Sequence, residues 1–332
     1  MYDDTGALVG LTTFYFAEGQ SLNFAVPIDW VKDLAKRSAK TQQTAETTTT
    51  WLSKAAELET RNDWPAQLVH SLRWTKAQPN SGIAWVALGI AYANTKQHPR
   101  AITAYQQALR INPEKAEVWY MFGNAYIETL QYPLAINAYQ QAQRINPEYF
   151  EAWYNLGNTY IETLQYPLAI NAYQQALRIN PEYFKAWFYL GNSYNGTKQH
   201  IQAINAYQQA LRINPEYADA WNNLGNSYNN TKQNIQAINA LQQALRIDPE
   251  HASAWYSLGL TYFDTKQYSQ GINSFQQALR INPEYAAAWY VLGASYYITN
   301  NRAKMIEVYK KLKILDSVLA DKFFNQFILP GG

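Results

Sequence analysis

Histidines, carboxylates and amides are the side chains of this sequence whose types could support catalysis or ligand binding. The four histidines are scattered, and His98 and His200 share one phase of a 34-residue repeat in which Tyr132 and Tyr166 also occur. We therefore expect them to be surface residues between helices. No HExxH, GxxxxGK[ST] or GxSxG pattern is present, so the sequence predicts no catalytic centre, no metal site and no cofactor.

The acidic and basic residues recur at fixed phases. Glu128 and Glu162 lie one repeat apart and could bind a cation or a basic peptide, although a solvated rim is the simpler interpretation. Six arginines also share one phase, and a glutamate follows each of them four residues later, which predicts local charge compensation and not a phosphate-binding track. These arginines are Arg110, Arg144, Arg178, Arg212, Arg246 and Arg280.

Composition narrows the classes of partner. The 332 residues carry a formal net charge of +2 with 16% charged residues, so no strong field favours nucleic acid. No apolar run approaches the roughly 18 residues that cross a bilayer, so no membrane contact is predicted. The beginning, MYDDTGALVG, lacks a basic segment and predicts no signal peptide. The location stays unknown: cytoplasmic by default, or periplasmic if the chain is part of an exported protease.

The elements that must position these side chains follow from a repeat. The stretch Ala116 to Tyr149 recurs almost verbatim from Phe150 to Tyr183. In each unit Trp, Leu, Gly and Tyr lie on one face of a first helix, and A-I-x-A-Y-x-x-A-L on one face of a second. Glycine at one phase of a helix implies close approach of a neighbouring helix. Asn-Pro-Glu between units is expected to cap and begin a helix, and Pro99, Pro133 and Pro167 suit the start of second helices.

The pattern W-x-x-L-G-x-x-Y, A-x-x-x-Y-x-x-A and P resembles the tetratricopeptide (TPR) family. The resemblance implies an all-α fold, a right-handed TPR superhelix or α-solenoid. Seven clear 34-residue repeats and one degenerate repeat, Thr48 to Ser81, would then fill residues 48–319.

The N-terminal residues 1–37 differ from the repeats. Leu8–Phe16 and Leu22–Val26 are expected strands of a hairpin, and Trp30–Lys36 an expected short helix. The strings G-x-L-V-G-L-T-T and G-Q-S-L-N-F-A-V-P-I-D-W-V resemble the closing segment of trypsin-like peptidases of the Deg/HtrA kind. No G-x-S-G-G motif is present, so no catalytic triad can be assigned. A hairpin and helix that merely cap the array is the alternative.

The remaining segments join and close the array. Residues 38–50 are polar and predict a linker, and residues 320–332 predict a capping helix and tail. The apolar Phe323, Phe324, Phe327 and Ile328 either pack on the array or form a patch for a partner. The hairpin and this helix are the two candidates for self-association.

The predicted binding residues lie on the first helix of each unit, numbered from Ala116 as position one. Side chains at the second, fifth, sixth, ninth, twelfth and thirteenth positions vary between copies, and in the TPR family this stripe lines a concave groove. The candidate binding residues are those at its fifth, sixth and ninth positions. An amide offers a donor and an acceptor to a peptide backbone, and tyrosine gives a large contact area. We expect these side chains to be exposed in the free protein. They are Tyr120, Asn124, Tyr154, Asn155, Asn158, Phe188, Asn192, Asn222, Asn223, Asn226, Tyr256 and Tyr290.

These features predict a non-catalytic protein-interaction scaffold that binds an extended peptide or a partner helix in the groove. The charged clamp of the TPR family, which holds a C-terminal carboxylate, is not matched, since Lys185 is the lone cation of the stripe. The alternative is a regulatory or substrate-recruiting arm of a trypsin-like protease.

Overall fold

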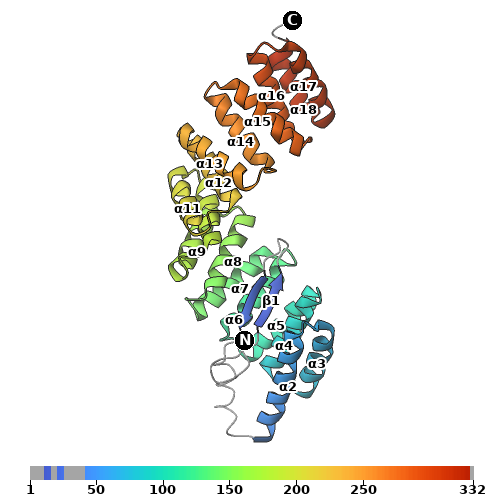
Figure 1. The fold of residues 1–332 in the computed structure, drawn as a ribbon. Helices are drawn as coiled ribbons and strands as arrows, with labels where there is room; N and C mark the ends of the chain where they lie inside the picture. Colours follow the sequence, from blue (N-terminus) through green and yellow to red (C-terminus); the bar gives the residue numbers. More distant parts are fainter. Residues whose placement is uncertain (1–10, 16–20, 26–41, 330–332) are drawn as a thin grey trace. The chain divides into compact units, whose positions relative to one another are not determined.

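The computed structural model describes residues 11–15, 21–25 and 42–329, with side chains from Thr48 onward. From Gln42 to Ile328 the chain is a succession of helices joined by short turns (Figure 1). The all-α prediction is confirmed. The expected helix Trp30–Lys36 lies outside the described residues.

The helices fall into two compact units, residues 1–159 and 160–332. Helix α8 contains the boundary between them. The helices of the first unit, up to and including α8, are α2 (Gln42–Thr60), α3 (Trp64–Ala77), α4 (Gly82–Asn94), α5 (His98–Ile111), α6 (Ala116–Ile127), α7 (Tyr132–Ile145) and α8 (Phe150–Glu162).

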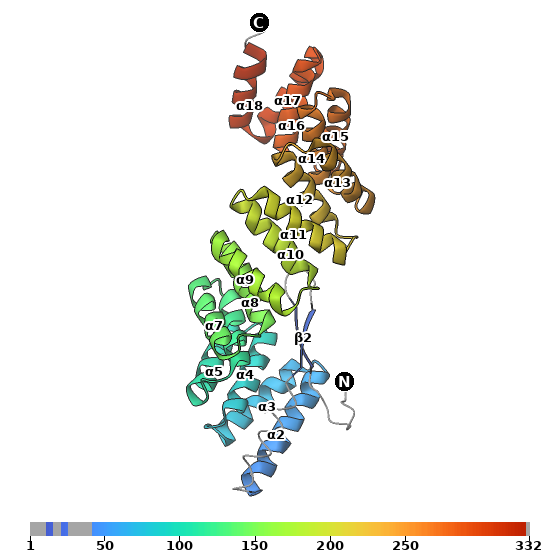
Figure 2. The same cartoon turned by 90° about the vertical axis from the view of Figure 1, so that its left-hand side faces the viewer.

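The second unit continues the alternation of first and second helices (Figure 2). Its helices are α9 (Tyr166–Ile179), α10 (Phe184–Gly196), α11 (His200–Ile213), α12 (Ala218–Asn230), α13 (Asn234–Ile247), α14 (Ala252–Asp264), α15 (Tyr268–Ile281), α16 (Ala286–Ile298), α17 (Arg302–Leu315), α18 (Ser317–Phe323) and the π-helix η2 (Phe324–Ile328).

The repeated glycines lie under an aromatic or branched side chain of the second helix. A Cβ added at Gly123 would lie 2.5 Å from the ring of Tyr139, and one at Gly191 would lie 2.5 Å from the ring of Tyr207. Both tyrosines are fully buried. The predicted close approach is thus confirmed, and the neighbour is a ring from the same repeat.

The repeated tryptophan and proline are joined by a hydrogen bond. The indole N–H of Trp119 donates to the backbone carbonyl of Pro113 at 2.8 Å, and Trp187 bonds in the same way to Pro181. Helix α6 begins only at Ala116, so Pro113 belongs to the turn before the helix. The expectation that Asn-Pro-Glu caps and begins a helix is therefore wrong. Asn112 instead ends α5, and its side chain accepts from the backbone N–H of Glu114.

The turn inside each repeat is closed by a residue with left-handed backbone. Lys96 and Leu130 have φ values of 60° and 57°. Gln97 N–H donates to the carbonyl of Tyr92 at 2.8 Å, which closes the end of α4. The second helix then begins with proline at its first turn, as expected for Pro99 and Pro133.

Both ends of the array differ from the internal repeats. Helix α2 begins at Gln42, inside the stretch expected to be a linker, so the helical region starts earlier than Thr48. At the other end Phe323 is fully buried against Gly293, and the Phe327 ring lies 5.3 Å from that of Tyr297. Of the two alternatives for this segment, the structure shows the packed one.

The two described strands, Leu11–Tyr15 and Ser21–Ala25, pair antiparallel with Tyr15 opposite Ser21. Among the described residues, none of the helices has the length and apolar character to cross a membrane. The same residues hold no group of three or more histidines and carboxylates placed to ligate a metal ion.

Candidate functional site

The fifth-position side chains mostly connect repeats. Tyr120 is fully buried, and its ring lies 5.2 Å from that of Tyr149, which precedes the next first helix. Phe188 meets Tyr217 in the same way at 4.8 Å. The expectation that this position is exposed is wrong for these residues, because the next repeat covers them.

The rest of the fifth position is also covered to different degrees. Tyr154 and Asn222 are each 7% exposed. Tyr256 is partly buried, with its ring 4.8 Å from that of Tyr285. Tyr290 donates its hydroxyl to Gln326 of the C-terminal segment at 2.6 Å. An intermolecular role for this position would therefore depend on Tyr256 more than on the others.

The amides of the first unit hold a buried tyrosine. Asn124 Oδ1 accepts from the hydroxyl of Tyr139 at 2.6 Å and from Asn155 Nδ2 at 3.1 Å. Asn155 Nδ2 also donates to the hydroxyl of Tyr120 at 3.0 Å. Burial raises the pKa of Tyr139 well above its ordinary value. Asn124 and Asn155 are themselves buried, so the predicted exposure is wrong for both.

The second unit repeats this arrangement and extends it. The hydroxyl of Tyr207 donates to Asn192 Oδ1 at 2.7 Å, and Asn223 Nδ2 donates to the same oxygen at 3.0 Å. Asn195 Nδ2 donates to the Tyr207 hydroxyl at 3.1 Å. Asn195 Oδ1 accepts from His200 Nδ1 at 3.0 Å. The tyrosine and the histidine are thus both paired by one amide that the sequence analysis did not select.

Asn226 keeps a partly exposed side chain and has no second-helix tyrosine in its repeat. In the repeat of Asn226, Leu241 replaces the second-helix tyrosine, so no hydroxyl at that position can bond the Asn226 amide. No hydrogen bond of the Asn226 side chain is found within residues 48–329. Asn158, one of its counterparts, is also partly exposed. The ninth position therefore offers a free amide mainly at Asn226.

The histidines are not the surface residues that the sequence suggested. The His98 side chain is 15% exposed, and its Nε2 lies 3.8 Å from a carboxylate oxygen of Glu128. Burial lowers its pKa, opposed by the charge of Glu128. Together with Tyr105 it lines a cavity of about 210 Å³. Glu128 is thus paired loosely with a histidine at the rim of this cavity.

Comparison with known protein families agrees with the repeat. The family profile described as TPR repeat matches residues 89–129 and 123–163. These units are tetratricopeptide repeats. A second profile, described as the C-terminal domain of cilia and flagella-associated protein 70, matches residues 165–310. Neither profile is that of an enzyme. The search of curated proteins finds no match.

Solved TPR structures share the fold at low sequence identity. YrrB, described as a TPR protein with an unusual peptide-binding site, is 24% identical with a TM-score of 0.51, covering 56% of this chain and 96% of YrrB. The C-terminal part of a TPR protein from Cytophaga hutchinsonii is 15% identical with a TM-score of 0.61, covering 71% of this chain and 97% of its own. PilF of Pseudomonas aeruginosa is 16% identical with a TM-score of 0.54, covering 64% and 97%. At these identities the likeness concerns the fold.

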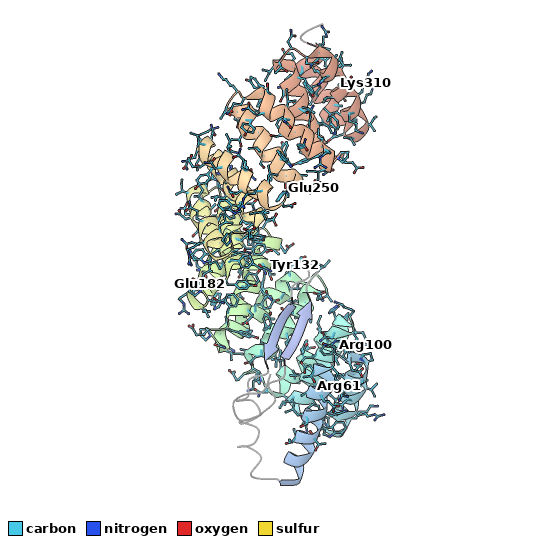
Figure 3. All side chains as sticks on the ribbon, viewed as in Figure 1. Arg61, Arg100, Tyr132, Glu182, Glu250 and Lys310 are labelled. Atoms are coloured by element: carbon cyan, nitrogen blue, oxygen red, sulfur yellow. The ribbon has the colours of Figure 1, made fainter. Side chains whose placement is uncertain are left out.

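The exposed face of the second helices, here named the outer face, carries the arginines, and their partners differ from the prediction. Arg212 pairs with Glu182 of the preceding turn at 2.9 Å, and Arg280 pairs with Glu250 at 2.7 Å (Figure 3 labels both glutamates). The predicted glutamate four residues later is not the partner in either case. It lies beyond the end of the helix, whereas the glutamate of the preceding turn lies beside it.

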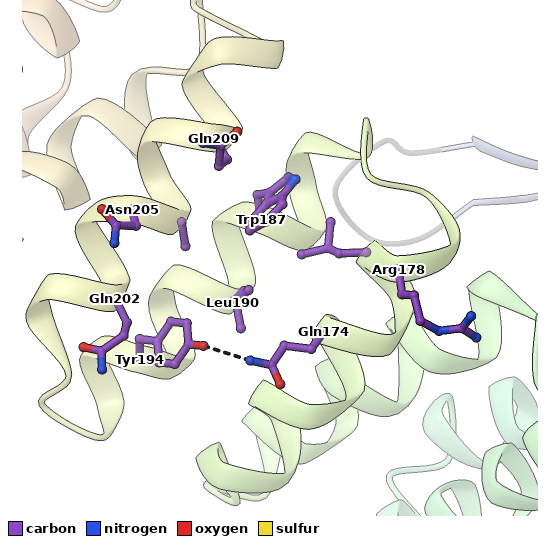
Figure 4. Close-up of a pocket in the computed structure, with 10 residues that line it drawn as sticks. Gln174, Arg178, Trp187, Leu190, Tyr194, Gln202, Asn205 and Gln209 are labelled. Atoms are coloured by element: carbon purple, nitrogen blue, oxygen red, sulfur yellow. Dashed lines mark hydrogen bonds between the residues drawn. The ribbon is translucent and has the colours of Figure 1, made fainter.

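Shallow clefts recur on this outer face between successive second helices. One is lined by Gln174, Arg178, Trp187 and Tyr194 among others, and Gln174 donates to the hydroxyl of Tyr194 at 3.0 Å (Figure 4). A cleft at the equivalent position surrounds Gln276 and Tyr296, although Lys304, Glu307 and Lys311 line the wall where the first cleft has amides. This recurrence follows from the repeat and does not single out one binding place.

The sequence analysis missed a set of exposed aliphatic side chains in the turns inside the repeats and at the start of the second helices. Each of the two near-identical repeats presents two leucines with between 46% and 72% of their surface exposed, and isoleucines lie nearby in two later repeats. They are Leu130, Leu134, Leu164, Leu168, Ile201 and Ile235. An apolar residue in a predicted turn was the available signal.

Proposed function

We propose that this chain is a non-catalytic protein-interaction scaffold that binds an extended peptide or a partner helix along the first helices of its repeats. The TPR fold supports the class of function. YrrB, which shares this fold, has a peptide-binding site by its description. The observation that carries the proposal is the partly exposed amide of Asn226, which has no tyrosine hydroxyl to bond.

The chemistry of this surface favours recognition of backbone over charge. Asn226 is a partly exposed amide of α12, whereas its neighbour Asn223 already donates to Asn192. Tyr256 follows in α14 and is partly exposed. Amides bond both the N–H and the carbonyl of a peptide. Affinity for such a partner should depend only weakly on salt, because few cations take part.

The test compares Asn226→Ala with Asn239→Ala, a matched change on the exposed face of the second helix α13. A peptide or protein partner recovered with the wild-type chain is titrated against both variants. We expect Asn226→Ala to weaken binding by about 3- to 10-fold, as loss of one hydrogen bond does, with Asn239→Ala unchanged. Wild-type affinity for Asn226→Ala would remove this amide from the mechanism.

A second candidate is a recruiting arm of a trypsin-like protease. It is supported by the resemblance of the N-terminal strings to the closing segment of Deg/HtrA-type peptidases. A reading frame that encodes G-x-S-G-G directly upstream of Met1 would support this candidate. If the upstream region encodes no such motif, the interaction scaffold remains as the one candidate function.

A further inference from the structure

One pair of polar residues, a histidine and a tyrosine, occurs twice in the array with different side chains around it. His98 and Tyr105 lie three 34-residue repeats before His200 and Tyr207, at the same positions. In the later copy Asn195 bonds both residues, Asn192 accepts from Tyr207, and Asn223 supports Asn192. The later pair is therefore saturated by side chains of the chain itself.

In the earlier copy the partners are replaced by apolar residues. Ile90 stands where the later copy has Asn192, Ala93 where it has Asn195, and Met121 where it has Asn223. Ser227, whose hydroxyl lies 2.9 Å from Asn195 Nδ2, is matched in the earlier copy by an alanine at position 125. The histidine and the tyrosine are retained while four of their polar neighbours are lost.

The result is an open space with bare polar atoms. Within the described residues, His98 Nδ1 and the Tyr105 hydroxyl are buried and have no hydrogen-bond partner. Tyr105 is 1% exposed. Both residues line the cavity of about 210 Å³, as do Ala93, Met121 and Ala125. A buried polar group without a partner costs about 1–3 kcal/mol, so this arrangement favours a group that would bond both atoms.

The lining also defines how a ligand could enter. Lys96 and Glu128 are exposed at the rim, and Trp64 forms part of the wall. A liquid water occupies about 30 Å³, so the space is large enough for the end of a long side chain. Met121, Asn124 and Glu128 occupy the sixth, ninth and thirteenth positions of α6. The cavity therefore lies on the stripe predicted to bind peptides.

We propose that this cavity binds a primary carboxamide, such as the end of a glutamine or asparagine side chain of a bound peptide. The carboxamide takes the place of Asn195: its oxygen accepts from His98 Nδ1, and its NH₂ donates to the Tyr105 hydroxyl. The apolar stem of the side chain contacts Trp64 and Met121. This deepens the proposed function, because it assigns a side-chain preference to one place on the scaffold.

The test uses the full chain with ¹⁵N-labelled histidine, and small probes in place of a partner. N-acetylglutamine N-methylamide is titrated while the four imidazole resonances are followed. The glutamate analogue serves as the isosteric control and the norleucine analogue as the apolar control, and propionamide separates a free amide from a peptide side chain. His200 is an internal control, since its amide partner belongs to the chain.

We expect the glutamine probe to shift His98 saturably, with His200 unmoved, and to bind about tenfold tighter than the glutamate analogue or the norleucine analogue. Propionamide binding as tightly as the glutamine probe would assign the site to free amides, which keeps the carboxamide chemistry. Ala93→Asn should abolish the shift by placing the amide internally. Tyr105→Phe should weaken binding about tenfold.

Three results would overturn the proposal. They are a His98 resonance unmoved by the carboxamides, an equal response to norleucine, and an equal shift of His200. Because no partner is present, these outcomes are independent of the Asn226 titration. Loss of partner binding with an intact His98 response would remove the scaffold proposal and keep the pocket.

Discussion

The repeat that contains Tyr105 and the repeat that contains Tyr207 have the same two-helix arrangement. The buried hydrogen bonds around the two tyrosines differ. Tyr207 is bonded by Asn192 and Asn195, whereas the Tyr105 hydroxyl has no partner in the described chain and adjoins a cavity. The comparison teaches that a TPR unit fixes the backbone through its tryptophan, glycine and alanines. The amides that join neighbouring repeats can then be kept or replaced. When they are replaced, a buried tyrosine hydroxyl loses its hydrogen-bond partners.

The largest expected difference comes from overpacking beneath the two rings. Gly191→Leu and Gly89→Leu would each drive a side chain into a tyrosine ring, since an added Cβ already lies 2.5 Å and 2.4 Å away. We expect Gly191→Leu to lower the free energy of unfolding by about 3 kcal/mol. Gly89→Leu should cost about 1 kcal/mol less, because the ring of Tyr105 adjoins free space. Urea unfolding followed by circular dichroism measures both. Equal losses would mean that the cavity gives no relief.

Removing the two hydroxyls sharpens the comparison directly. Tyr207→Phe removes one hydrogen bond each from Asn192 and Asn195 and should cost about 1–3 kcal/mol. Tyr105→Phe removes a buried hydroxyl that bonds nothing and should be neutral or slightly stabilising. The two unfolding free energies are measured under one condition. A loss for Tyr105→Phe as large as for Tyr207→Phe would show that Tyr105 is already bonded.

A pH dependence is expected from the unsaturated pair. Burial lowers the pKa of His98 below its ordinary 6.5, with Glu128 raising it and Lys96 lowering it. The folded state therefore binds this proton more weakly than the unfolded state. The stability contribution is complete above pH about 6.5 and is lost as the pH falls through the folded pKa.

We expect the wild type to lose stability relative to His98→Gln between pH about 8 and 5. Thermal melting of both proteins across that range measures the difference. A gap that stays constant with pH would contradict the assigned direction of the pKa. This effect should be smaller than those of the ring substitutions, since the imidazole is partly exposed.

The smallest expected effect is on the outer face of the saturated repeat. Arg212 pairs with Glu182 across an exposed surface, with 56% and 66% of their side chains accessible. Arg212→Ala should change the free energy of unfolding by no more than about 0.5 kcal/mol, because exposed ion pairs contribute little. A cost matching that of Tyr207→Phe would show that the outer face also stabilises the contact between repeats.

The sequence allowed prediction of the helices because tryptophan, glycine and proline recur at one interval. Even so, it misplaced Pro113, since a period shows that a residue matters without showing where the helix begins. It also placed Tyr120 and Asn124 on an open surface. Variation between copies was taken as freedom from packing, whereas the structure shows Asn124 bonded to the buried hydroxyl of Tyr139 and to Asn155 of the next repeat. The pocket at His98 could not be predicted from the sequence, because only the contacts around Tyr207 show which amides are missing around Tyr105.

The C-terminal helix has a consequence for the history of the array. Phe323 covers Gly293 from beyond the last repeat, where internal repeats use an aromatic or branched side chain of their own second helix. The closing contact thus depends on the final unit alone. A duplication or deletion of one whole unit farther upstream leaves that contact unchanged. The number of repeats can therefore change while the same C-terminal contact closes the array. Duplication of one unit would also produce two near-identical repeats side by side, such as the pair that meets at Phe150.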